Sequence, residues 1–106
     1  MDEIMVLVTT SSKEEGEKIG RALVERRLAA CANIVPSISS IFSWEGKINR
    51  EQESLMILKS KRGCLAQLIE EVKRQHSYSV PEIIALPIVD GSPEYLKWIR
   101  ENTEST

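Results

Sequence analysis

The residues with the most obvious chemical potential lie near the C-terminal end, in the stretch HSYSVPEIIALPI that begins at His76. His76 is the only histidine of the chain, and Tyr78 and Glu82 follow it closely. An imidazole can exchange a proton or bind a metal near neutral pH. At the end of a helix it can also simply cap the chain, because the helix dipole favours a positive charge there. The sequence leaves three interpretations open: a metal site, a proton-transfer site or a helix end.

Four further side chains could share a cleft with this histidine. Lys59 ends an apolar segment and could be a surface lysine, an ion-pair partner of Glu53 or Glu82, or a contact for an anion. Glu82 could pair with Lys59 or serve as a carboxylate ligand near the histidine. Trp44 and Tyr78 are large rings with a polar edge, which suit subunit interfaces.

An enzyme could use His76, Tyr78, Glu82 and Lys59 for general acid–base chemistry. However, the chain has no nucleophile–base pair at a recognisable spacing, no Gly-rich phosphate loop, and no G-x-S-x-G or H-E-x-x-H motif. We therefore expect a protein that is not an enzyme and that has no organic cofactor.

Composition favours a single globular domain spanning residues 1–106. The chain is 42% hydrophobic and 28% charged, and its net charge is −2, with no basic block. Nucleic acid and anionic membranes are therefore unsupported as partners. The N-terminal segment MDEIMVLVTTSS lacks the pattern of a secretory signal, so we expect a cytoplasmic protein. Cys31 and Cys64 are expected to be reduced and buried.

The first half of the chain predicts a strand, a helix and a long hairpin. Residues 4–8 read as a strand buried on both faces. Residues 12–28 predict a helix that begins with a capping box formed by Ser12 and Glu15. Apolar side chains at even positions between Ile34 and Trp44 predict one face of a strand, with Pro36 marking an edge or a bulge. A turn at 45–46 then leads into the return strand KINREQESLMILKSK.

The second half predicts a helix, a strand and a last helix. The segment RGCLAQLIEEVKRQH carries an apolar stripe at helical spacing and ends near His76. Residues 81–89 predict a strand, with Pro87 suggesting an edge or a bulge. Ser92 and Pro93 suit the start of the last helix, and residues 102–106 are expected to form a frayed tail.

This order of elements predicts an α+β, ferredoxin-like βαββαβ sandwich with a C-terminal helix. Each hairpin arm of about 14 residues would span roughly 45 Å. A compact chain of this size is only roughly 35 Å across. The hairpin would therefore overhang its own domain, and its apolar edge would need a cover. We expect a homo-oligomer.

Several segments in this order resemble the CutA family of divalent-cation tolerance proteins: LAACAN, WEGKI, HSYSVPEI and YLKW. The likeness covers roughly residues 4–103. It implies a homotrimer similar to the PII signalling proteins and a role in tolerance to copper and other divalent metals. An alternative is a PII-like signalling trimer that binds a small anionic ligand or a protein partner in its inter-subunit clefts, without a physiological metal.

The resemblance also implies a copper site made of a cysteine, a glutamate and a histidine. The histidine maps onto His76 and the glutamate onto Glu53, whereas the cysteine position is occupied by Val8. Valine cannot ligate, which counts against tight copper(I) binding. The expectation is a weak, partly hydrated site for Cu²⁺ or another divalent cation, with Lys59, Tyr78, Glu82 and Trp44 as further cleft residues.

Overall fold

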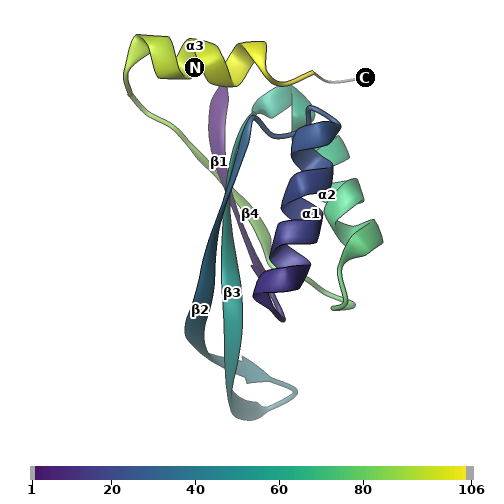
Figure 1. Ribbon diagram of the computed structural model, residues 1–106. Helices are drawn as coiled ribbons and strands as arrows, with labels where there is room; N and C mark the ends of the chain where they lie inside the picture. The colour runs from purple at the N-terminus through teal and green to yellow at the C-terminus, as the bar shows by residue number, and fades with distance from the viewer. Residues whose placement is uncertain (1, 105–106) are drawn as a thin grey trace.

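The computed structural model describes residues 2–104 and shows a four-stranded antiparallel sheet in the order β2-β3-β1-β4. Helices α1 and α2 cover one face of the sheet, and α3 lies across the end away from the hairpin tip (Figure 1). The predicted ferredoxin-like fold is confirmed. The elements are β1 Glu3–Thr10, α1 Lys13–Glu25, β2 Cys31–Trp44, β3 Lys47–Lys61, a short 3₁₀ turn Arg62–Cys64, α2 Leu65–Gln75, β4 Ile83–Pro87 and α3 Pro93–Glu101.

The core fills the space between the sheet and helices α1 and α2. Val6, Val8 and Leu58 from the sheet are fully buried there, as are Leu23 and Leu68 from the helices. Met5 and Leu7, which alternate with them along β1, point to the opposite face and are only half-buried. The prediction that this strand is buried on both faces is therefore wrong for the isolated chain.

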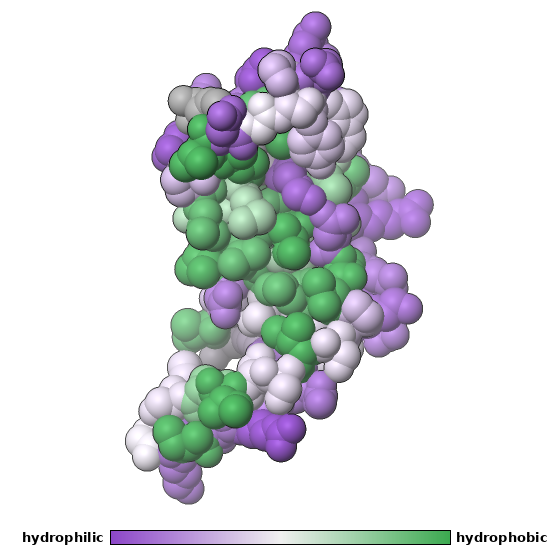
Figure 2. Space-filling view, turned by 90° about the vertical axis from the view of Figure 1, so that its left-hand side faces the viewer, coloured by the Kyte–Doolittle hydropathy of each residue, from purple (hydrophilic) through white to green (hydrophobic). Residues whose placement is uncertain are grey.

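That opposite face, which we call the open face, is apolar. Figure 2 shows hydrophobic side chains gathered over the middle of the molecule. Strand register places on this face the side chains of Met5, Leu7, Val35, Leu55, Ile57, Ile84 and Leu86. Ile84 is 51% exposed and Leu86 39%. A continuous apolar surface on a sheet is typical of an interaction site.

Helix α1 is shorter than the predicted range 12–28, because the chain leaves the helix after Glu25 and Arg27 adopts a left-handed φ of 60°. The predicted N-terminal cap is half confirmed. The Glu15 amide donates to Ser12 Oγ at 3.1 Å, but the Glu15 carboxylate accepts from the amide and hydroxyl of Ser11 instead of from Ser12. This anchors the residues between β1 and α1.

The hairpin of β2 and β3 extends well beyond the end of β1. Strand β1 pairs with β3 only as far as Ser54, which leaves 47–53 without a partner on that side. The overhang is roughly 23 Å at ~3.3 Å per residue, and the molecule measures 43 × 26 × 22 Å. The turn at Glu45 and Gly46 is confirmed, with left-handed φ values of 51° and 77°.

The C-terminal segments differ from prediction at their ends. Strand β4 is limited to Ile83–Pro87, within the predicted 81–89. The predicted fraying is wrong for 102–104: Thr103 is buried, its carbonyl accepts from Lys61 Nζ at 2.8 Å, and the Glu104 amide donates to Arg27. Residues 105 and 106 lie outside the described part of the chain. Within residues 2–104, no helix has both the length and the hydrophobicity needed to cross a membrane.

Both cysteines are free thiols. Cys64 is buried as expected, but Cys31 is only half-buried, because it begins β2 on the open face beside Lys59. The expectation of two buried cysteines is therefore wrong for Cys31.

Candidate functional site

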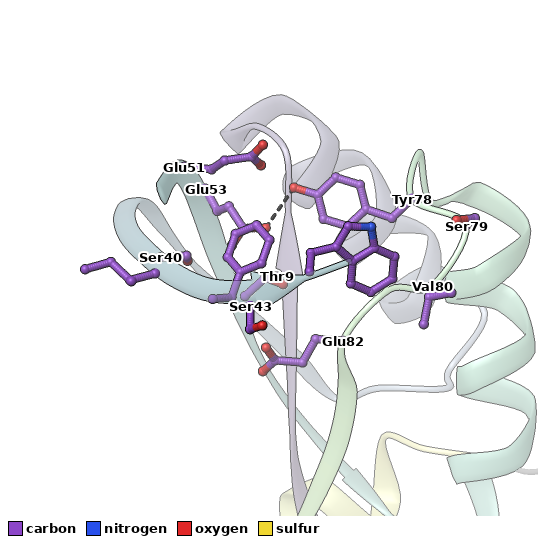
Figure 3. A pocket seen from close by; sticks show the side chains of 12 residues that line it. Thr9, Ser40, Ser43, Glu51, Glu53, Tyr78, Ser79, Val80 and Glu82 are labelled. Carbon is purple, nitrogen blue, oxygen red and sulfur yellow. Dashed lines mark hydrogen bonds between the residues drawn. The ribbon is translucent and has the colours of Figure 1, made fainter. Parts of the chain in front are cut away.

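A groove of about 650 Å³ lies between the hairpin and the segment that leads into β4. Figure 3 shows Glu51 and Glu53 on the hairpin, with Tyr78 and Glu82 facing them from the connecting segment. The lining residues are Thr9, Ser40, Ile41, Phe42, Ser43, Trp44, Glu51, Glu53, Tyr78, Ser79, Val80 and Glu82. Three of them are carboxylates, three are aromatic, and this lining contains no lysine, arginine or histidine.

A bulge in β2 brings the aromatic and acidic side chains to one face. Val35 pairs with Leu55, but Ile38 pairs with Glu53, so β2 carries one extra residue at this point. Since side chains alternate along a strand, the extra residue turns the outer half of β2 over. Phe42, which pairs with Asn49, therefore shares a face with Glu53.

The predicted bulge at Pro36 is thus confirmed, but the prediction of a single face for the even positions is wrong. Ile34, opposite the buried Met56, lies on the helix side, and Ile38 lies on the open face.

Glu53 and Tyr78 form the polar centre of the groove. The Tyr78 hydroxyl donates to Glu53 Oε2 at 2.7 Å, and Glu53 is only 9% exposed. Burial, together with the hydrogen bond to Glu53 and the negative charge of that carboxylate, raises the pKa of the Tyr78 phenol. The phenol therefore stays protonated and holds the carboxylate in place.

His76 lies beside this centre, but its side chain is completely buried. Its Nε2 atom donates to the Thr9 carbonyl at 2.7 Å, because a carbonyl can only accept. Its Nδ1 atom accepts from the Tyr78 amide at 3.0 Å. The rings of His76 and Tyr78 are in contact, with centroids 4.7 Å apart and planes tilted by 48°. The histidine thus joins the end of α2 to β1 and positions Tyr78.

Glu15 reinforces the same junction from the N-terminus of α1. Its Oε2 atom accepts from the Ser77 amide at 2.8 Å and lies 3.9 Å from His76 Nδ1. Burial alone would raise the pKa of Glu15, but the hydrogen bonds from Ser11 and Ser77 outweigh it and lower the pKa to about 2. The segment after α2 is therefore held by an ionised carboxylate.

The predicted site residues fall into two groups. Trp44, Tyr78, Glu53 and Glu82 all line the groove, whereas Lys59 lies outside it. Lys59 Nζ donates to Asn33 Oδ1 and lies 3.9 Å from Cys31 Sγ. It is six residues from Glu53 along β3, roughly 20 Å at ~3.3 Å per residue. An ion pair between these two residues, or an anion contact from Lys59 in this groove, is therefore excluded.

Sequence reasoning missed Glu51, Phe42 and the role of Glu15. Glu51 lies two residues from Glu53 on β3 and so shares its face, with Ser40 of β2 opposite. Its spacing of two residues from Glu53 was a visible signal on a strand. Glu15 gave no such signal, because its contact with Ser77 joins segments 62 residues apart.

Residues 4–102 match a protein family described as CutA1 divalent ion tolerance protein. The chain belongs to this CutA1 family.

A divalent-cation tolerance protein CutA from Thermus thermophilus is 50% identical over 97% of this chain and 99% of its own length. The solved structure of a divalent cation tolerance protein (Cut A1) from the same organism superposes with a TM-score of 0.95 at 50% identity, covering 96% of this chain and 99% of the other. A chloroplastic CutA protein from Arabidopsis thaliana is 45% identical over 96% of this chain, which spans 56% of that relative's length.

The copper site that resemblance to the CutA family implies does not fit these residues. Both nitrogens of His76 are used in hydrogen bonds to the backbone, so neither offers a lone pair to a metal. The Tyr78 ring contacts that of His76 while its hydroxyl donates to Glu53, so Tyr78 stands between the two expected ligands. Position 8 is a fully buried valine. Across residues 2–104, no three His, Cys, Asp or Glu side chains are arranged to hold a metal ion.

Proposed function

We propose that this protein acts in the cellular response to divalent cations, copper included, as a homotrimer whose ligand site is the groove between the hairpin and 76–82. The observation that carries the trimer is the combination of an overhanging hairpin with an apolar open face. Membership of the CutA1 family supports the link to divalent cations. The proposed role is binding rather than catalysis, without an organic cofactor.

The proposal of an oligomer is supported by surfaces that one chain leaves uncovered. Ile41 and Ile48 on the overhang are 72% and 78% exposed, and Ile84 on the open face is 51% exposed. Exposed apolar strands of this length aggregate unless another chain covers them. Light scattering should give a mass of about 36 kDa, three times the 12.0 kDa chain. Ile84→Asp places a charge on the open face and should release smaller species, whereas Ile84→Val should not.

Divalent cations would be held weakly in the groove. Glu51, Glu53 and Glu82 supply carboxylate oxygens there, but they do not form a closed set of ligands. A cation would keep most of its water. Calorimetric titration of Cu²⁺ and Zn²⁺ should give weak heats that fall in Glu53→Gln. Equal heats in wild type and this variant would show that the cation does not bind in the groove.

The cellular role has its own test. In a bacterial strain that lacks its own CutA1 gene, expression of this chain should restore growth in elevated copper. Expression of Ile84→Asp should restore less growth, because the trimer is weakened. Growth no better than with an empty vector would overturn the tolerance role.

A cytoplasmic location is also part of the proposal. Its support is that Cys31 and Cys64 are free thiols, as is usual in a reducing compartment. Cell fractionation with markers for each compartment tests it directly.

A signalling trimer without a physiological metal is the second candidate. It is favoured by the size of the groove and by the absence of a three-ligand metal arrangement in residues 2–104. The groove does not suit an anionic ligand, since its lining is acidic. A thermal-shift comparison of ATP with cationic compounds tells an anionic ligand from a cationic one, because a ligand that binds the folded state raises the melting temperature.

A further inference from the structure

We propose that the groove binds a small organic cation, an ammonium or guanidinium group attached to an apolar body. This inference rests on the proposed function in one respect: the groove lies on the same side of the sheet as the open face, and it is taken as a cleft that remains accessible where the chains of the trimer meet. It does not depend on metal tolerance.

The negative charge of the groove favours a ligand that carries a positive charge. Glu51, Glu53 and Glu82 face one space, and no basic side chain of the lining neutralises them. Glu53 is nine-tenths buried, and only its Oε2 atom is bonded, to the Tyr78 hydroxyl. Within residues 2–104, its Oε1 atom has no hydrogen-bond donor, although the residue lines the groove. This oxygen is not among the buried polar atoms that lack a partner, so it is open to the groove and can accept a hydrogen bond from a ligand.

The walls select the kind of cation. Phe42, Trp44 and Tyr78 line the same space as the carboxylates. Aromatic faces attract ammonium and guanidinium groups and also pack against apolar chains, whereas a strongly hydrated metal ion gains little from them. Trp44 is 51% exposed and Tyr78 is locked by His76 and Glu53. The Trp44 wall of the groove is thus half open to solvent, whereas the Tyr78 wall is fixed by its contacts.

The size of the groove agrees with an organic ligand. Its volume of about 650 Å³ lies within the ~300–1,000 Å³ range of small-molecule sites. A single metal ion would leave most of this space to water. A ligand with a cationic head at Glu53 and an apolar body between the aromatic rings would fill it.

The test uses agmatine, which carries a guanidinium and an ammonium group on a four-carbon chain. Its matched control is 4-guanidinobutanoate, in which a carboxylate replaces the ammonium group. Titration calorimetry on the intact wild-type oligomer should show saturable binding of agmatine, at least ten-fold tighter than binding of 4-guanidinobutanoate. Equal affinity for the two compounds, or no saturable heat with agmatine, overturns the proposal.

Variants locate the binding. Glu53→Gln keeps the shape and an acceptor for Tyr78 but removes the charge, and it should weaken agmatine binding roughly ten-fold. Trp44→Leu should weaken it by a similar factor, and Trp44→Phe should retain most of the affinity. Glu94→Gln is the matched control, because Glu94 is an exposed carboxylate in the first turn of α3, outside the groove. Equal affinity in Glu53→Gln and Glu94→Gln would overturn the assignment to the groove.

The two proposals can fail separately. If agmatine binds and copper tolerance is not restored, the groove assignment stands and the metal role falls. If tolerance is restored but agmatine does not bind, the organic cation is excluded and the proposed function stands.

Discussion

The bond between Tyr78 and Glu53 offers the sharpest test of the site. Tyr78→Phe removes one hydroxyl and leaves the ring in place, while Glu53 remains 9% exposed with its carboxylate short of a donor. Hydrogen bonds to charged groups contribute about 1.5–3 kcal/mol to stability. We expect the free energy of unfolding to fall by about 2 kcal/mol.

A double-mutant cycle with Glu53→Gln isolates this interaction. A glutamine can still accept from Tyr78, but as a neutral group, so Tyr78→Phe should cost only about 1 kcal/mol in that background. Urea unfolding of the four proteins gives the coupling energy. It must be measured at one protein concentration, because the stability of an oligomer depends on concentration.

Tyr95→Phe is the matched control. Tyr95 is 44% exposed and its hydroxyl neighbours the weakly bonding Cys31 thiol, so the variant should lose less than about 0.5 kcal/mol. A cost of that size for Tyr78→Phe, or the same cost in both Glu53 backgrounds, would refute the view that this bond organises the groove.

Three further perturbations test other parts of the structure. His76→Ala should lower the free energy of unfolding by about 2–4 kcal/mol, because a buried ring and two backbone bonds are lost, yet leave the heat of Cu²⁺ binding unchanged; loss of copper binding in a folded variant would contradict the geometry. The pKa of Glu15 is lowered by folding to about 2, so its contribution is present above pH 4.5 and lost as the pH falls toward 2. Calorimetric melting between pH 2 and 6 should show a flatter acid limb for Glu15→Gln, and parallel curves would refute the assignment. Gly20→Ala should cost about 1–3 kcal/mol in urea unfolding, since the new Cβ would lie 2.9 Å from Ala32 Cβ, whereas Gly91→Ala, 3.4 Å from the nearest side-chain atom, should be nearly neutral.

The sequence predicts the elements well because each carries a local signal. The capping serine of α1, the turn at Gly46 and the apolar stripe of α2 all depend on neighbours within a few residues. The end of α1 was predicted too late in the chain, because Leu28 continues the apolar pattern after the helix has ended. It is buried by the core, not by helical position.

The site was only partly predictable, because its contacts join distant segments. Tyr78 reaches Glu53 across 25 residues, and His76 reaches Thr9 across 67. No local pattern shows that both nitrogens of His76 are occupied. The family motif suggested a ligand, whereas the fold uses the ring as a link between α2 and β1. The prediction that Lys59 lies in the cleft was wrong for a simpler reason: the distance along β3 alone separates it from the groove.

The extra residue in β2 has a consequence for how this chain can vary through evolution. Loss of either Pro36 or Ser37 would leave a single residue opposite Ser54, so the ladder would become regular while Ile38 stayed paired with Glu53 and Phe42 with Asn49. The aromatic and acidic walls would then stay on one face, without a change in any of those side chains. Relatives that retain the groove are therefore expected to include chains that lack one residue at this point of β2.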